Sequence, residues 1–289
     1  MRARLFAFAL ALAWLATLPT ASAEVVSADE LSFPDFYAAP GDNVEWTDFK
    51  PIYSRTDPTW GPILTDIVEH LPANQYGTYY DADKVTHAHE TSHGIHAHLR
   101  NNFNRTGKKA NAFYALQNRA AIVIEPNMRK SQVGAFVPAN LRGPRYSTYV
   151  TGQSAWDDTP LYIFDEWNAY VNGGAEGVNL VEAGLWRYGQ RDAVEGQLEF
   201  VVYALATAMA IQRFDNNYFV NYAQFREFLA FNIARSMSIF HRGAKMPVFA
   251  RATQDQYFVK FKTSPEAATM RNFASQLFGE TWVNENIFP

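Results

Sequence analysis

Apolar residues recur at helical spacing in several stretches of the chain. Ile63, Ile67 and Leu71 lie four positions apart, which predicts a short amphipathic helix over residues 63–71. Residues 197–213 are apolar almost all round, which indicates a buried helix. Their uninterrupted apolar run, residues 200–211, is too short to span a membrane. Further helices are expected over residues 221–241 and 265–278.

Two other helices carry start or stop signals. Asp81 and Asp83 can cap a helix that runs to about Asn102. Residues 161–171 form the second, and Asn172-Gly173-Gly174 are expected to end it.

A different pattern occupies residues 112–117 and 119–125, which are rich in β-forming residues. Asn118 stands at a possible tight turn and Pro126 follows the second run, so a hairpin or two neighbouring strands are expected. Residues 24–62 and 127–160 contain many prolines and glycines, which predicts an extended N-terminal arm and an irregular segment. The expected fold class is α+β, predominantly α-helical, with one domain over residues 63–289.

Composition narrows the class of protein. The chain has 289 residues, of which 48% are hydrophobic and 15% aromatic, so it can bury enough surface to fold. It has no cysteine, which excludes disulfides, thiolate metal sites and cysteine nucleophiles. The net charge of -4 is unfavourable for non-specific nucleic-acid binding, which needs clustered basic residues.

The N-terminus has the order of a secretory signal peptide. Arg2 and Arg4 precede an apolar stretch, and Ala21-Ser22-Ala23 form a cleavage site of small residues. Cleavage after residue 23 would leave 23 basic and 29 acidic residues, a net charge of -6. An exported protein, periplasmic or secreted and without a stable membrane span, is therefore expected. An uncleaved N-terminal anchor is the alternative.

The chemistry of the chain centres on His89-Glu90-Thr91-Ser92-His93, an H-E-x-x-H pattern inside the helix capped by Asp83. Two histidines four positions apart on a helix project from one face, so both imidazoles can reach one Zn²⁺ at about 2.0–2.1 Å. Glu90 can reach a water beside the metal and take its proton. A histidine-rich metal-binding tract without catalysis is the alternative interpretation.

On these residues the sequence resembles the zincin metallopeptidases. In the metzincin branch a glycine and a third histidine follow at fixed spacing, whereas this chain has His96 and Leu99 at those positions. The resemblance therefore implies a gluzincin, in which a glutamate on a later helix is the third zinc ligand. It also implies a zincin-like catalytic domain, Zn²⁺ as cofactor, and a peptide or protein as substrate.

Glu166 is the preferred third ligand. It lies on the helix of residues 161–171, 73 positions after His93, and Ala169 one turn later would let this helix approach the metal helix closely. Glu199 is a serious rival because it opens a buried helix, where a carboxylate needs a partner. The remaining rivals are Asp165, Glu176 and Glu195.

The remaining candidates have supporting roles. His96 shares the face of His89 almost two turns away, which suits a role behind the metal or beside the substrate. His87 and His98 are expected at the surface or core edge, and His70 is expected to be structural. An oxyanion donor is also expected, and Asp165 is an option for orienting a histidine ligand. The candidates for that donor are Arg145, Tyr146, Tyr149, Tyr162 and His241.

Together these patterns predict an exported zinc metallopeptidase with Zn²⁺ bound by His89, His93 and Glu166, and Glu90 as general base. Strand 119–125 is expected to offer an edge on which an extended peptide adds by backbone pairing. The alternatives are a non-catalytic zinc-binding protein and a zinc hydrolase that cleaves a non-peptide amide in cell-wall material.

Overall fold

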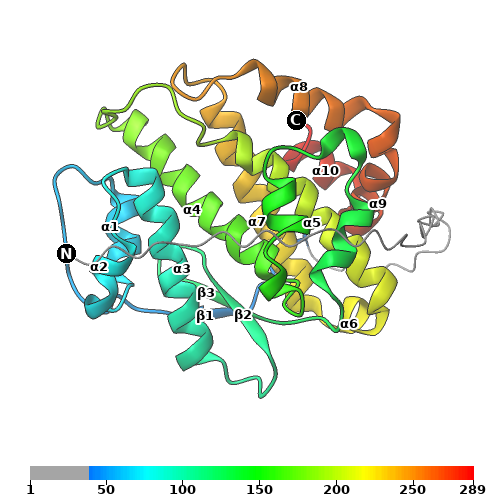
Figure 1. Cartoon of the computed structure of the whole chain (residues 1–289), viewed down its shortest axis with the longest axis horizontal. Helices are drawn as coiled ribbons and strands as arrows, with labels where there is room; N and C mark the ends of the chain where they lie inside the picture. Colours follow the sequence, from blue (N-terminus) through cyan, green and yellow to red (C-terminus); the bar gives the residue numbers. More distant parts are fainter. Residues whose placement is uncertain (1–38) are drawn as a thin grey trace, which may run out of the picture.

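A computed structural model of the chain describes residues 39–289. The expected signal peptide, residues 1–23, and the arm as far as residue 38 lie outside this part. The described chain is predominantly helical, with one three-stranded antiparallel sheet, an α+β arrangement (Figure 1).

The sheet combines the predicted hairpin with a strand from the arm. Strands β2 (Ala110–Tyr114) and β3 (Arg119–Ile124) pair antiparallel, and β1 (Trp46–Asp48) pairs with the other side of β3. Backbone φ is positive at Asn118, as a tight turn requires, and also at Leu116 and Gln117. The expectation that residues 119–125 form a free edge is wrong, because β3 is the central strand.

Strand β2 is an edge strand. Two of its backbone groups that face away from β3 already form hydrogen bonds with side chains. The carbonyl of Tyr114 accepts hydrogen bonds from the side-chain amides of Asn168 and Asn172, at 2.8 and 3.0 Å. The amide oxygen of Asn111 accepts the N–H of Ala112 at 3.1 Å. These side chains block the edge at both positions.

Two long helices lie side by side at the centre of the molecule (Figure 1). Helix α3 spans Lys84–Phe103, and its N-terminus is capped as expected: the Asp83 carboxylate accepts the Thr86 N–H at 2.9 Å. Helix α4 spans Tyr162–Glu182. Together they carry every residue of the predicted metal site.

Helix α4 corrects the prediction that Asn172-Gly173-Gly174 end a helix. It continues ten residues beyond Asn172. The glycines instead permit close packing: a Cβ on Gly173 would lie 2.9 Å from the carbonyl oxygen of Val85 and 3.4 Å from Cβ of His89. Tertiary packing has therefore overridden the local stop signal.

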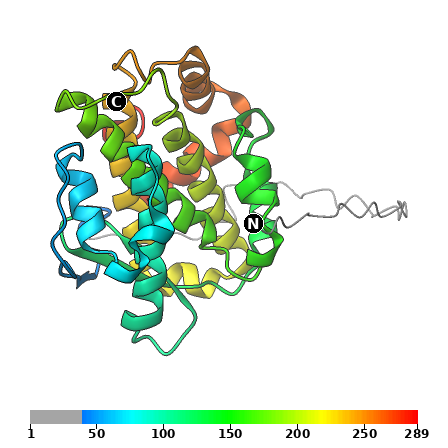
Figure 2. The same ribbon diagram turned by 60° about the vertical axis from the view of Figure 1, so that its left-hand side comes forward.

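The remaining helices surround α4 on both sides (Figures 1 and 2). On the N-terminal side, α1 (Pro62–Glu69) and the short α2 (Tyr76–Tyr79) pack against α3, and β2 contacts both α3 and α4. On the other side lies a bundle in which α5 and α7 contact α4. Its members are α5 (Glu195–Phe214), α6 (Asn216–Asn221), α7 (Ala223–Gly243), α8 (Ala252–Thr263), α9 (Ala268–Phe278) and α10 (Glu280–Asn286).

The helix over residues 197–213 is buried as predicted, from Gly196 to Gln212 within α5. No helix in residues 39–289 is long and apolar enough to cross a membrane. Helices α8 and α10 were not predicted, because neither shows a clear apolar stripe in the sequence.

The segment 127–160 is irregular, as predicted, but it is built from short helical turns. These are the 3₁₀ turns Lys130–Phe136, Ala139–Leu141 and Ser154–Trp156 and a π-helical turn, η5, at Tyr146–Thr151. Buried Lys130 ties them together, since its ammonium donates to the carbonyls of Tyr149, Val150 and Gly152 at 3.1, 3.1 and 2.7 Å. Turn η5 thereby gains a fixed position beside α4.

Candidate metal centre

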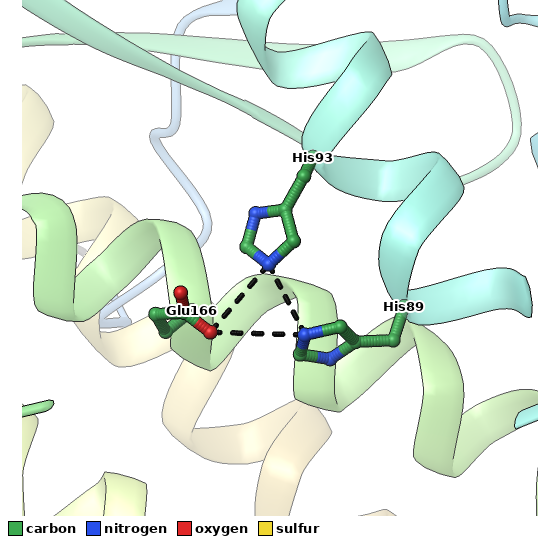
Figure 3. A group of neighbouring side chains, drawn as sticks. All are labelled: His89, His93 and Glu166. Atoms are coloured by element: carbon green, nitrogen blue, oxygen red, sulfur yellow. Dashed lines mark hydrogen bonds and ion pairs between the residues drawn. The ribbon is translucent and has the colours of Figure 1, made fainter. Parts of the chain in front are cut away.

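The three predicted ligands converge at the contact between α3 and α4. His89 and His93, one turn apart on α3, bring their Nε2 atoms to 3.1 Å from each other. Oε2 of Glu166 on α4 lies 3.7 Å from Nε2 of His89 and 3.5 Å from Nε2 of His93. Figure 3 shows both imidazoles and the carboxylate pointing toward one another. Such a group of atoms could hold one metal ion.

Glu166 is held by its own helix. Its carboxylate is almost buried, with the residue 7% exposed, and Oε1 accepts the hydroxyl of Tyr162 at 2.6 Å. Tyr162 precedes Glu166 by one helical turn, so the two side chains lie on one face. This bond leaves Oε2 as the oxygen that faces the histidines.

The rival carboxylates are engaged elsewhere. Glu199 forms an ion pair with Arg145 at 2.5 Å and accepts the hydroxyl of Tyr203 at 2.8 Å. Glu176 accepts the backbone N–H of Leu64 at the start of α1, at 3.0 Å. Glu195 begins α5 and does not belong to the group around the histidines.

Asp165 orients the histidines from behind. Its Oδ1 accepts Nδ1–H from both His93 and His96 at 2.7 Å, and its Oδ2 pairs with Arg100 at 2.6 Å. Although burial opposes ionisation, His96 and His93 hold the pKa of Asp165 well below its usual value. With Nδ1–H of His93 held by Asp165, Nε2 of His93 faces His89 and Glu166, and a metal ion bound there would replace the proton that the charged imidazole carries on Nε2.

The atoms of His93, His96 and Asp165 are also close enough together to hold a metal ion. In this group, however, both imidazoles already donate to Asp165, and the Arg100 guanidinium supplies the positive charge. The group is therefore complete as a hydrogen-bonded support for His93. His96 thus lies beside Asp165 and supports the candidate ligand His93 through that carboxylate.

The first histidine is suited to bind as a neutral ligand. Burial, with the positive charge of neighbouring His93, lowers the pKa of His89 well below its usual value. Its ring meets the Tyr170 ring edge-on, at a centroid distance of 4.8 Å. The packing therefore fixes the direction of its Nε2 atom.

A cavity of about 230 Å³ opens beside His89 and Glu90. Glu90 is exposed, and its carboxylate forms no hydrogen bond or ion pair with another residue in 39–289. The walls come from the start of α3, the middle of α4, η5 and the segment before α5. The other lining residues are Val85, Thr86, Arg145, Tyr149, Tyr170, Gly173, Gly174, Arg191, Asp192 and Ala193.

Of the five expected oxyanion donors, Tyr149 is the best placed. It lines the cavity, and its hydroxyl lies 3.3 Å from that of Tyr170. Burial, the Tyr170 hydroxyl and the negative charge of Glu166 raise the pKa of Tyr149, so it keeps its proton.

The other four expected donors have different partners. Arg145 also lines the cavity, but Glu199 and Asp192 engage its guanidinium. Tyr146 donates to the carbonyl of Gly134, and Tyr162 donates to Glu166. His241 packs against the rings of Phe240 and Phe258.

The other histidines have structural surroundings. His87 is fully buried among the rings of Trp60, Tyr76 and Tyr80, deeper than the surface or core-edge position expected for it. His70 is structural, as expected: its ring bonds to the carbonyl of Asp66 and the side chain of Asn118. His98 is half-buried against Phe49 and Phe103, at the core edge as expected.

Sequence reasoning missed one residue that shapes the cavity from outside the motif. Arg191 forms an ion pair with the capping residue Asp83 and donates to the hydroxyl of Thr86 at 2.9 Å. It therefore ties the segment before α5 to the first turn of α3. No local pattern marks Arg191, because its partners lie more than a hundred positions earlier in the chain.

Comparisons with protein-family models, with curated proteins and with solved structures found no match.

Proposed function

We propose that the chain is an exported zinc-dependent metallopeptidase of the gluzincin type, with a zincin-like catalytic domain. The observation that carries the proposal is the convergence of His89, His93 and Glu166 beside a cavity that also exposes Glu90. Two imidazoles and one carboxylate form the donor set of many hydrolytic zinc sites. Export rests on the sequence of residues 1–23 alone.

The candidate ligand atoms are of the kinds that Zn²⁺ prefers, and other side chains hold two of the three ligands in place. Both histidines present Nε2, Asp165 binds the opposite nitrogen of His93, and Tyr162 binds the second oxygen of Glu166. Within residues 39–289 the group contains three ligands, the number typical of catalytic zinc sites. When bound, zinc would acidify a water molecule and polarise the substrate carbonyl.

In this proposal Glu90, which lines the cavity beside His89, is the general base. Because no described residue pairs with its carboxylate, Glu90 is free to accept a proton from the attacking water. The water oxygen bonds to the carbonyl carbon, and Glu90 then returns the proton to the nitrogen as the C–N bond breaks. Tyr149 donates a hydrogen bond to the carbonyl oxygen as negative charge develops there.

The test begins with the metal content and peptide hydrolysis of the purified chain, measured by elemental analysis and with a set of fluorogenic peptides. The Glu90→Gln variant should keep its zinc and lose at least about 100-fold in kcat, at the low end of the effect of general acid–base catalysis. The control is Glu285→Gln, on the exposed surface of α10.

Two results would change the proposal. A wild-type protein that binds zinc but cleaves no peptide would support a non-catalytic zinc-binding protein or a hydrolase of another amide. Full activity in Glu90→Gln would exclude Glu90 as the base.

A further inference from the structure

A chain of polar side chains runs from the metal centre to helix α7. At its far end, Arg235 of α7 has no carboxylate within ion-pair distance among the described residues. Its guanidinium donates to three side-chain amide oxygens: Asn168 at 3.3 Å, Asn172 at 2.9 Å and Asn232 at 3.2 Å. All three asparagines are fully buried. A cation in such surroundings is costly unless its donors are satisfied.

The guanidinium fixes which way the Asn168 amide faces. Because Oδ1 accepts from Arg235, the NH₂ group must point the opposite way. Its two hydrogens go to the carbonyl of Tyr114, at 2.8 Å, and to Nε2 of His96, at 3.0 Å. Asn172 is held in the same manner and donates to Tyr114 and Ser92.

The Asn168 amide in turn selects the tautomer of His96. A nitrogen that accepts from an NH₂ group carries no proton, so neutral His96 must be protonated at Nδ1. That N–H donates to Oδ1 of Asp165, the same oxygen that accepts Nδ1–H of His93. Donor and acceptor match at each step from Arg235 to His93.

We propose that Arg235 is a positioning residue for the metal centre, acting through Asn168, His96 and Asp165 on the orientation of His93. These hydrogen bonds from Arg235 through Asn168, His96 and Asp165 to His93 form a relay. The relay holds Asp165 where it accepts the N–H of His93, so Nε2 of His93 remains turned toward His89 and Glu166. The inference rests on the proposed metal site, and it assigns to α7 a role that the ligands alone do not reveal.

The decisive variant is Asn168→Asp. A carboxylate cannot donate to Nε2 of His96 and instead favours a proton on that nitrogen. His96 then either changes tautomer and loses the Nδ1–H that it donates to Asp165, or gains a second proton and places a positive charge beside His93, and both changes alter the support that His93 receives. Asn232→Asp is the matched control, because it makes the same change beside the same guanidinium without touching His96. Melting temperatures of the metal-free proteins check that both variants fold.

Two measurements test the relay. Nitrogen-15 NMR of the metal-free wild type should show His96 protonated at Nδ1 and bare at Nε2, with Nε2 protonated in Asn168→Asp only. Zinc titration should show about 10- to 100-fold weaker binding in Asn168→Asp and unchanged binding in Asn232→Asp.

The outcomes separate this inference from the proposed function. A wild type that binds no zinc overturns the proposed metal site. Zinc binding by the wild type with equal affinity in Asn168→Asp overturns the relay alone. If Asn168→Asp does not fold, the wild-type spectrum decides, because a proton on Nε2 of His96 contradicts the relay.

Discussion

At the residue scale, two of the three candidate ligands are oriented by a hydrogen bond with a second side chain. Glu166 is held by Tyr162, and His93 is held by Asp165. Glu90 differs from them because no described side chain binds its carboxylate. Under the proposed function, this contrast separates the side chains that would hold the metal from the one that would move a proton.

Tyr149→Phe tests the donor to the carbonyl oxygen. The change removes one hydroxyl and keeps the ring, so we expect kcat to fall about 100-fold, as for loss of one oxyanion donor, with similar KM and zinc content. Steady-state kinetics on a cleaved fluorogenic peptide provide the measurement. Tyr146→Phe on the same π-helical turn is the control, because its hydroxyl bonds to Gly134. Equal kcat values in the two variants would contradict the role of Tyr149.

At the element scale, the close contact between α3 and α4 decides whether the candidate ligands His89, His93 and Glu166 meet. Gly173 of α4 lies against Val85 and His89 of α3, and Arg191 ties the start of α3 to the segment before α5. Gly173, which the sequence suggested as part of a helix stop, is instead a point where the two helices approach each other, whereas Gly174 faces Ala193 and Gln197.

Gly173→Ala should disturb this contact. The added Cβ would lie 2.9 Å from a backbone oxygen that cannot rotate away, so the helices must move apart. We expect a loss of about 1–3 kcal/mol in the free energy of unfolding, together with weaker zinc binding. Urea denaturation and zinc titration measure the two effects. Gly189→Ala, where a Cβ meets nothing within 4 Å, should change neither. Equal stability of the two variants would show that the contact tolerates a methyl group.

At the scale of the whole molecule, one buried carboxylate links stability to pH. Glu176 of α4 accepts backbone N–H groups of Gly61 and Leu64 at the N-terminus of α1. Burial outweighs these bonds and raises the pKa of Glu176 to about 7, from a usual value of 4.5. The folded state therefore binds a proton that the unfolded state releases between these two pH values.

The raised pKa of Glu176 makes the folded protein less stable as the pH rises. With a raised pKa in the folded state, the contribution of Glu176 to stability is fully present below pH 4.5 and is lost as the pH rises to about 7. The rise in the pKa of Glu176 from 4.5 to about 7 corresponds to about 3 kcal/mol in the free energy of unfolding. Glu176→Gln should therefore gain stability relative to the wild type by roughly this amount between pH 4.5 and 7.

Urea denaturation at a series of pH values measures that difference. Glu285→Gln, at an exposed position, is the control. A Glu176→Gln difference that stays constant with pH would show that folding does not change the pKa of this carboxyl group.

The sequence alone determined the local features of this protein. The cap at Asp83 and the one-turn spacing of His89 and His93 depend only on helix geometry, so they could be read from neighbouring residues. The hairpin and the buried helix α5 were equally local, since each follows from a short run of apolar or β-forming residues.

Only the tertiary structure decided which distant residues meet. It turned Glu166 rather than Glu199 toward the histidines, placed β3 inside the sheet, and connected Arg235 to His93 through α4. Asp165 and His93 are 72 positions apart, and no periodicity of the chain encodes that separation. The physical reason is that the docking of helices depends on packing and hydrogen bonding among all their neighbours, which a local pattern does not contain.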